Sequence, residues 1–129
     1  MLSNVYSEIH KKYFDELEEE QQRLKGIDLR KLPIGTKLEV FTKNSVYTME
    51  IISPKGEVKL MGGKRWPEFV YANIPGSTWG GTALKILWIG YGMHMEICVG
   101  DKTVTTTAVR AATITGPDYS FKMEWDNNE

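Results

Sequence analysis

Residues 37–63, KLEVFTKNSVYTMEIISPKGEVKLMGG, alternate apolar and polar side chains in three short runs. Turn-forming residues separate these runs at Asn44-Ser45 and at 53–56, and Gly62-Gly63 ends the last one. Alternation with period two between turn residues is typical of half-buried strands. The pattern therefore predicts a three-stranded antiparallel meander. Its inward-facing residues are expected to be Leu38, Val40, Tyr47, Met49, Ile51, Val58 and Leu60.

The chain after this meander carries further strand signals. Residues 69–74 predict one strand, and the nearly all-apolar run 83–89 predicts a central strand covered on both faces. Residues 93–99 alternate, and Gly100-Asp101 signals a hairpin to a partner strand at 103–109. Many short strands between such turns predict a small barrel, or a compact sandwich, of about six to eight antiparallel strands. We favour the barrel, because closure leaves no exposed sheet edge.

An amphipathic helix is predicted ahead of the strands, from residue 2 to residue 24. Ser3 or Asn4 is the expected N-cap, and Gly26 is expected to end the helix in the left-handed conformation. The apolar residues form a stripe about 120° wide, with Phe14 off the stripe. This stripe has to be buried against the barrel or against another chain. Its members are Leu2, Val5, Tyr6, Ile9, Tyr13, Leu17 and Leu24.

The 129 residues suit a single folded unit with three parts. We expect an N-terminal helix over 1–26, a β-barrel domain over 27–117 and an acidic C-terminal tail over 118–129. The tail carries one basic and four acidic residues, a balance of −3. We expect it to fray, with Phe121 and Trp125 as the residues able to anchor it.

Composition and targeting signals indicate an ordinary globular chain. Hydrophobic residues make up 41% and charged residues 26%, both near the averages for globular proteins. The single cysteine, Cys98, rules out an internal disulfide and suits a reducing compartment. The first residues do not form a signal peptide, and no apolar run approaches the roughly 20 residues that span a bilayer. We expect a cytoplasmic protein without membrane contact.

Five short segments of the sequence carry a family resemblance. They are NSVY (44–47), GG (62–63), GSTWGGTALK (76–85), IGYGM (89–93) and TTAV (106–109). Together they resemble a family of small, uncharacterised bacterial proteins, over roughly residues 33–114. The segment 76–85 is the most specific of the five. Because that family has no assigned activity, the resemblance implies a shared β fold and no particular chemistry.

The glycine-rich loop 75–81 is a candidate anion site, because consecutive backbone N–H groups can surround an anion. It lacks the spacing of a phosphate-binding motif. The alternative, which we favour, is a bulged turn that lets Trp79 pack back on the barrel. The candidate ligand-binding residues are Gly76, Ser77, Thr78, Trp79, Gly80 and Gly81.

His94, Glu96 and Cys98 alternate along one strand and share one face. At about 3.3 Å per residue they span roughly 13 Å, too far for one metal ion or for a Cys98–His94 hydrogen bond. Glu39 and Glu50, like Glu96, suit surface carboxylates better than catalytic acids. The sequence therefore indicates no catalytic residue, no metal site and no cofactor.

A basic stretch with interleaved aromatic residues is the candidate nucleic-acid site. Residues 27–66 carry eight basic and four acidic residues, a balance of +4. Barrels that bind single strands combine such charge with aromatic side chains. The alternative is solvated strand faces, since the whole chain has a net charge of −1. The candidate residues are Lys55, Lys59, Lys64, Arg65 and Trp66, supported by Lys37, Lys43 and Phe69.

Three functional hypotheses remain open from the sequence. The first is a non-enzymatic interaction module whose 2–24 helix or glycine-rich loop face binds a protein partner or a second copy of the chain. The second is a barrel that binds single-stranded nucleic acid through 55–69. The third is a small-ligand or metal site at the 76–81 loop or around His94. We favour the first, because the groups that carry catalysis are scarce.

Overall fold

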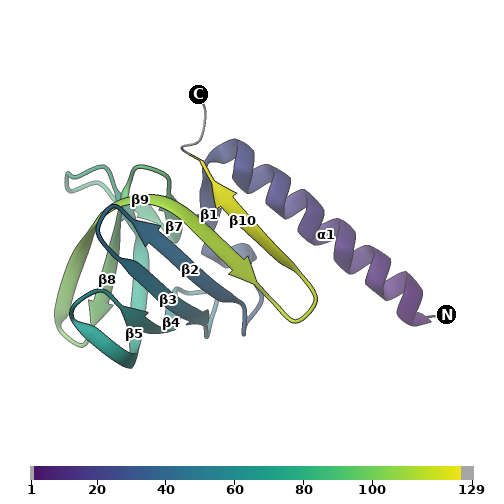
Figure 1. Cartoon of the computed structure of the whole chain (residues 1–129), viewed down its shortest axis with the longest axis horizontal. Coiled ribbons are helices and arrows are strands. Elements are labelled where there is room, and N and C mark those ends of the chain that lie inside the picture. Colours follow the sequence, from purple (N-terminus) through teal and green to yellow (C-terminus); the bar gives the residue numbers. More distant parts are fainter. Residues whose placement is uncertain (1, 126–129) are drawn as a thin grey trace.

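The computed structural model describes residues 2–125, with side chains described from Glu8 onward. The fold is mostly β behind one N-terminal helix, as predicted (Figure 1). The elements, in chain order, are α1 (Leu2–Leu24), β1 (Gly26–Asp28), the 3-10 helix η1 (Leu29–Lys31), β2 (Lys37–Thr42), β3 (Val46–Ile51), β4 (Glu57–Gly62), β5 (Trp66–Thr78), β6 (Lys85–Ile86), β7 (Trp88–Gly90), β8 (His94–Val99), β9 (Lys102–Thr115) and β10 (Ser120–Glu124).

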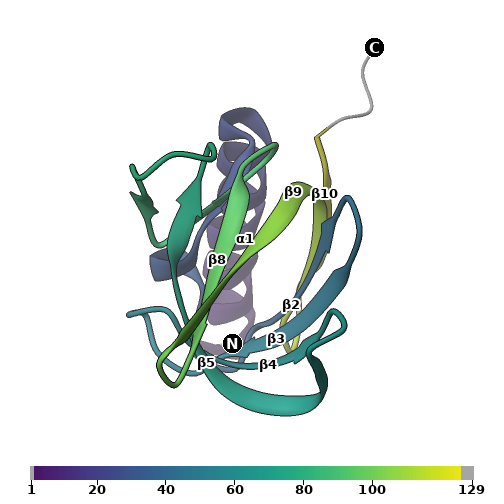
Figure 2. The same ribbon diagram turned by 90° about the vertical axis from the view of Figure 1, so that its left-hand side faces the viewer.

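Eight antiparallel strands form a ring-like sheet that is not a closed barrel. The ring runs β2–β3–β4–β5–β8–β9 and returns to β2, with β10 beside β9 and β6 beside β5. The long strands β5 and β9 change partners along their length. Residues 102–108 of β9 pair with β8 and residues 109–115 with β2. Figure 2 shows β9 curving from one side of the ring to the other.

The predicted meander is confirmed, and its inner face forms the centre of the core. Leu38 pairs with Met49, and Met49 pairs with Leu60, so one buried row crosses β2, β3 and β4. Met95 and Ile97 of β8 close the core from the other side of the ring. Alternation therefore predicted both the strands and the faces that they bury.

The predicted central strand over 83–89 is wrong. Only Trp88–Gly90 is buried, as β7, which pairs with β1 in a separate two-stranded sheet. Lys85–Ile86 forms the short edge strand β6, and Ile86 is 65% exposed. Leu87 separates the two strands with a φ of 54°, a left-handed conformation that breaks a continuous strand.

The end of α1 also differs from the prediction. The left-handed residue is Lys25, with a φ of 57°, and Gly26 already belongs to β1. Gly26 is needed for a different reason, because a Cβ there would lie 2.1 Å from Cζ2 of Trp88. A close approach to the indole, rather than a helix stop, therefore requires this glycine.

The prediction that the acidic C-terminal segment frays is wrong for residues 120–125. Ser120–Glu124 forms β10 and pairs with β9 from Ser120↔Thr115 to Glu124↔Ala111. Phe121, Met123 and Trp125 are buried, so alternate residues of this segment complete the core. Residues 126–129 lie outside the described part of the chain.

Candidate functional site

The first part of the glycine-rich segment belongs to a strand, and its hydroxyl groups form hydrogen bonds within the chain. Gly76, Ser77 and Thr78 belong to β5, and the buried Ser77 hydroxyl donates to the Trp88 carbonyl oxygen at 2.6 Å. The Thr78 hydroxyl accepts from the Gly80 N–H at 3.2 Å and donates to the Gly81 carbonyl oxygen at 3.1 Å. Of the backbone N–H groups that the sequence suggested for an anion, that of Gly80 is therefore already bonded to the Thr78 hydroxyl.

Trp79 does not pack back into the barrel as expected. Its side chain is 72% exposed. Only one edge of its ring covers the backbone, since a Cβ at Gly92 would lie 3.3 Å from Cζ3 of Trp79. The turn therefore presents an aromatic residue at the surface.

The outer face of β8 carries the three residues considered for metal binding or catalysis. His94 Nδ1 lies 2.9 Å from the Thr106 carbonyl oxygen, and Glu96 accepts from the Thr105 hydroxyl at 3.3 Å. Cys98 Sγ lies 3.6 Å from the Thr103 hydroxyl oxygen. Each of the three side chains thus has a polar contact with a threonine of β9. Across the described residues, no three His, Cys, Asp or Glu side chains are grouped to hold a metal ion.

The residues of the predicted basic segment lie in separate parts of the fold. Lys55 lies in the turn before β4, whereas Lys64 and Arg65 lie in the turn between β4 and β5. Lys59 projects outward from β4 with its Nζ 5.4 Å from the ring centroid of Phe69. On the next strand, Glu50 pairs with Lys59, so one carboxylate reduces the positive charge of this face.

Two groups of residues emerge from this division. Lys59, Phe69 and Tyr71 share the outer face of β4 and β5, where Tyr71 is 75% exposed. We call this group the β4–β5 face. Arg65 and Trp66 instead line a hollow together with Val99, Lys102 and Val104. Sequence reasoning missed the last three, because they come from a distant hairpin that only the fold brings close.

Helix α1 is attached to the β-structure along a narrow line. Among the side chains of residues 8–24, those of Phe14, Leu17 and Gln21, spaced three and four residues apart, are buried. Gln21 Oε1 accepts from the Asp28 backbone N–H at 3.0 Å, and the Trp125 indole N–H donates to the Gln21 carbonyl oxygen at 3.3 Å. Phe14, expected to lie off the apolar stripe, is therefore central to the contact.

An aromatic contact fixes the middle of α1 to the segment before β10. The Phe14 and Tyr119 rings stack with centroids 3.6 Å apart, and the Tyr119 and Thr36 hydroxyl oxygens lie 2.6 Å apart. Burial raises the pKa of the Tyr119 phenol above its ordinary value of 10.0, against the opposing effect of the Thr36 hydrogen bond. His10 Nδ1 lies 3.0 Å from Asp118 Oδ2 on the same side.

The predicted apolar stripe of α1 is only partly buried. Leu17 packs on the barrel, but Ile9 is 64% exposed, Tyr13 46% exposed, and Leu24 is also exposed. Tyr13 reaches η1, where its hydroxyl donates to the Lys31 carbonyl oxygen at 2.8 Å. The side chains of Leu2, Val5 and Tyr6, which belong to the same predicted stripe, lie outside the described residues.

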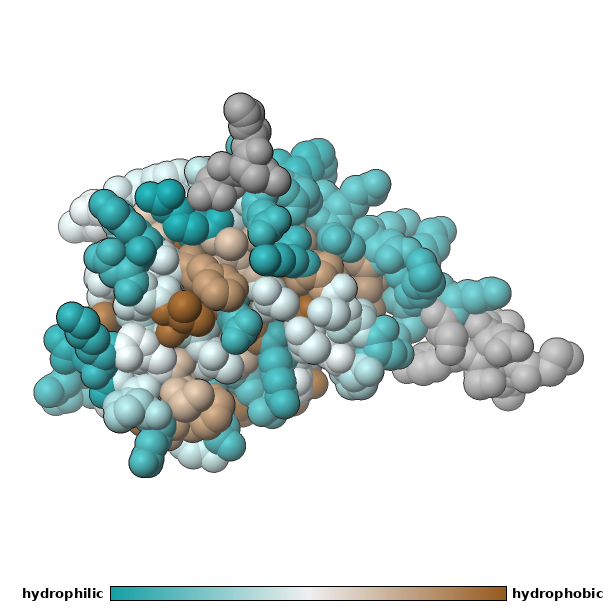
Figure 3. All heavy atoms as spheres, viewed as in Figure 1, coloured by the Kyte–Doolittle hydropathy of each residue, from teal (hydrophilic) through white to brown (hydrophobic). Residues whose placement is uncertain are grey.

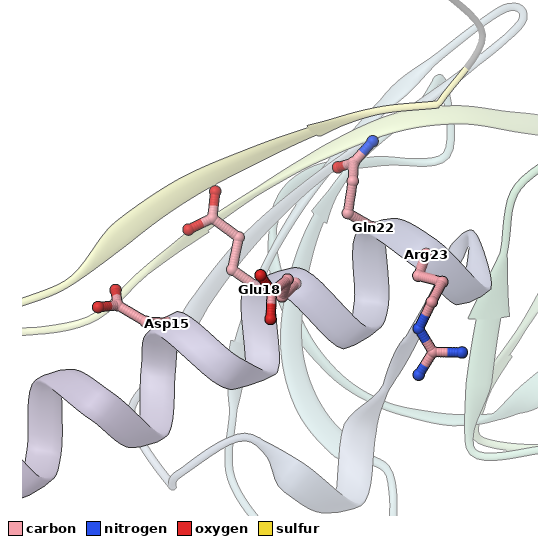
Figure 4. Close-up of a pocket in the computed structure, with 5 residues that line it drawn as sticks. Asp15, Glu18, Gln22 and Arg23 are labelled. Atoms are coloured by element: carbon pink, nitrogen blue, oxygen red, sulfur yellow. The ribbon is translucent and has the colours of Figure 1, made fainter.

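The side of α1 next to β10 is polar. In Figure 3 this side is mostly hydrophilic, and Figure 1 shows the N-terminal turns of α1 projecting past the end of β10. A shallow hollow here is lined by Asp15, Glu18, Glu19, Gln22 and Arg23. Figure 4 shows Gln22 and Arg23 pointing to opposite sides, so these groups do not converge on one ligand.

The exposed apolar residues lie on the other flank of the helix. Tyr13 lines two hollows there, one of which it shares with Pro33, next to the exposed Ile34. Ile9 and Tyr13, with the charged residues Lys12, Glu16 and Glu20 among and beyond them, are called the free face of α1. Of these charges, Glu20 is paired within the chain, because Lys31 Nζ donates to its Oε1 at 2.7 Å. At about 100° per residue these five side chains fall within one sector of the helix roughly 100° wide.

No helix among the described residues is long and apolar enough to cross a bilayer. The likeness to a family of small bacterial β proteins stays a prediction. Comparisons of this chain with family models, curated proteins and solved structures found no match.

Proposed function

We propose that this protein is a non-enzymatic interaction module that binds a second copy of itself through the free face of α1. The observation that carries the proposal is the exposure of Ile9 and of part of Tyr13, four residues apart on one flank of α1. The Tyr13 hydroxyl is held by the Lys31 carbonyl oxygen, and its ring stays 46% exposed. Apolar helix residues at this spacing are the usual anchors of helix-mediated contacts. A cytoplasmic location is part of the proposal, because the single cysteine suits a reducing compartment.

The charges on the free face favour a second copy over an unrelated partner. Lys12 lies beside the apolar pair, and Glu16 and Glu20 follow toward the C-terminal end. Two helices related by a two-fold axis perpendicular to them run antiparallel, so the basic part of each meets the acidic part of the other. Lys12 of one copy then faces Glu16 of the second. A parallel pair would instead place like charges together.

The surroundings of His94 and Cys98 support a non-enzymatic module. These two residues have the side chains best suited to acid–base or nucleophilic chemistry. Each contacts a threonine of β9, and they lie at opposite ends of β8's outer face. No base is therefore placed against the thiol.

Charge reversal tests the self-association. We expect Lys12→Glu and Glu16→Lys each to raise the dimer Kd about tenfold, because each makes two symmetric contacts repulsive. The double variant should recover most of the wild-type affinity, since opposite charges again face each other. Sedimentation equilibrium at low salt measures the four Kd values.

Two controls make this test specific. Lys43→Glu, an exposed change in the turn between β2 and β3, should leave the Kd unchanged. Raising the salt concentration should reduce the differences in dimer Kd among the charge variants, because salt screens the interactions between exposed charges. A double variant that dissociates as readily as the single variants would rule out the antiparallel arrangement.

A second candidate function is binding of single-stranded nucleic acid along the β4–β5 face. It is favoured by the position of Lys59 over the Phe69 ring and by the exposure of Tyr71. Phe69 and Tyr71 are two residues apart on one strand and project from the same face, so both rings are available to stack on bases.

Fluorescence anisotropy of a labelled oligothymidylate tests this second candidate. Tyr71→Ala should weaken binding about tenfold, because stacking of one base on an aromatic ring is worth about 1–3 kcal/mol. The matched control is Trp79→Ala, which removes an equally exposed ring from another part of the surface. Affinity should also fall as salt rises. Equal losses in both variants would exclude the β4–β5 face as the binding surface.

A further inference from the structure

A small hollow lies at one end of the ring, where two turns meet. The β4–β5 turn contributes Arg65 and the first residue of β5, Trp66, and the β8–β9 hairpin contributes Val99, Lys102 and Val104. Figure 1 shows both turns at the same end of the ring. We call this hollow the barrel-end pocket.

The pocket combines an apolar floor with cationic groups. Trp66 and Val99 are half-buried and pack against the core, and Val104 is also half-buried. Arg65 and Lys102 are exposed, and no carboxylate lines the hollow. Among the ion pairs of residues 8–125, none involves Arg65 or Lys102. Two cations beside an aromatic ring are therefore available to an anion.

The chemistry of the pocket selects the ligand class. An indole and two valines favour a flat apolar ring, which buries against them. A guanidinium and an ammonium favour an anionic group, and arginine binds phosphate or carboxylate with two parallel hydrogen bonds. The volume of about 250 Å³ lies just below the roughly 300–1,000 Å³ typical of ligand pockets, so the site suits one nucleotide rather than a larger ligand.

We infer that the barrel-end pocket binds a single nucleobase linked through its sugar to a phosphate, as in a nucleoside monophosphate. The base stacks on Trp66 while Arg65 and Lys102 bind the phosphate. The same chemistry is offered by a free nucleotide and by the terminal nucleotide of a single strand. The inference does not rest on self-association, because the pocket contains no residue of α1.

Isothermal titration calorimetry of the full chain tests the pocket with AMP as the probe. AMP should bind, whereas adenosine and inorganic phosphate should each bind at least tenfold more weakly, because each supplies only half of the interaction. Arg65→Ala and Lys102→Ala should each weaken AMP binding about tenfold. Trp66→Leu should weaken it as well, and far-ultraviolet circular dichroism confirms that each variant is folded.

Lys55→Ala is the matched control, because Lys55 belongs to the same basic segment but lies in another turn. It should leave AMP binding unchanged. If Lys55→Ala lost as much AMP affinity as Arg65→Ala, the inference that this pocket binds the nucleotide would be overturned. Equal affinities for AMP and adenosine would overturn it too. Lack of AMP binding by the wild-type chain would overturn it directly.

Two further binding measurements identify the source of the ligand and test whether the pocket is independent of self-association. A 5′-phosphorylated oligothymidylate that binds more tightly than AMP, and loses affinity in Arg65→Ala, assigns the pocket to strand ends. Weaker binding of the strand assigns it to free nucleotides. Ile9→Glu should leave AMP binding unchanged, so failure of the dimer proposal and failure of the pocket give different results.

Discussion

Gly26 shows how one residue joins the helix to the β-structure. It pairs with Gly90 between β1 and β7, and the Trp88 indole covers it so closely that a Cβ would lie 2.1 Å from the ring. Trp88 is itself buried, and Lys85 Nζ lies 4.0 Å from the centroid of its ring. The indole therefore has little room to move away from residue 26.

Replacing Gly26 by alanine should destabilise the protein. The added methyl group overpacks the junction, a change that typically costs about 1–3 kcal/mol. Urea unfolding of the variant measures the loss. The control is Gly81→Ala, where nothing lies within 4 Å of the added Cβ, and its free energy of unfolding should change by less than about 0.5 kcal/mol. Equal effects at the two positions would refute this account of Gly26.

At the scale of elements, the contact between α1 and the segment before β10 depends on one partly buried phenol. Tyr119 stacks on Phe14 of α1, and its hydroxyl oxygen lies 2.6 Å from that of Thr36. Burial raises the pKa of this phenol. In the unfolded chain Tyr119 therefore loses its proton at a lower pH than in the folded protein.

This difference predicts a loss of stability at high pH. Between about pH 10 and the higher folded-state pKa, the unfolded state binds fewer protons than the native state, so stability falls as pH rises. Tyr119→Phe lacks the titrating group and should be about 1 kcal/mol less stable at pH 8, through loss of the hydroxyl contact. Its stability should fall less steeply than that of the wild type above pH 10.

Urea unfolding of both proteins from pH 8 to pH 11 measures these slopes. All other residues are common to both proteins, so their contribution cancels in the difference. Parallel stability curves would show that Tyr119 titrates alike in the folded and unfolded chains.

Local pattern predicted the elements whose alternation was complete. Leu38 and Met49 were assigned to the inner face of the meander because polar residues flank each of them. β10 was missed because its acidic neighbours suggested a solvated tail, although Phe121 and Met123 alternate with Lys122. The split of 83–89 was not predictable, because it depends on the left-handed conformation of Leu87.

The candidate sites were predictable only where neighbours in sequence are neighbours in space. Arg65 and Trp66 were named together from their adjacency, and both line the barrel-end pocket. Lys102 was not named, because its approach to Arg65 depends on the path of the β8–β9 hairpin. The helix stripe was found from its spacing, but which residues it buries depends on Tyr119, far away in the sequence.

At the scale of the whole molecule, the ring of strands covers only part of the apolar surface of α1. Leu17 and Phe14 attach α1 to the β-structure, and the Tyr13 hydroxyl adds a hydrogen bond to Lys31, while Ile9 and much of the Tyr13 ring stay exposed. Figure 1 shows that the first turns of α1 extend beyond the strands. A second copy that covers the free face would remove these apolar side chains from water.

Sedimentation velocity across a range of concentrations tests this central claim most directly. The wild-type chain should shift from monomer to dimer as its concentration rises. Ile9→Glu should remain a monomer, because it places a charge in the apolar contact. Ile86→Glu makes the same change at an isoleucine of nearly equal exposure, 65% against 64%, and should still dimerise. A wild-type chain that stays monomeric at every concentration, or equal dissociation of the two variants, would contradict the account.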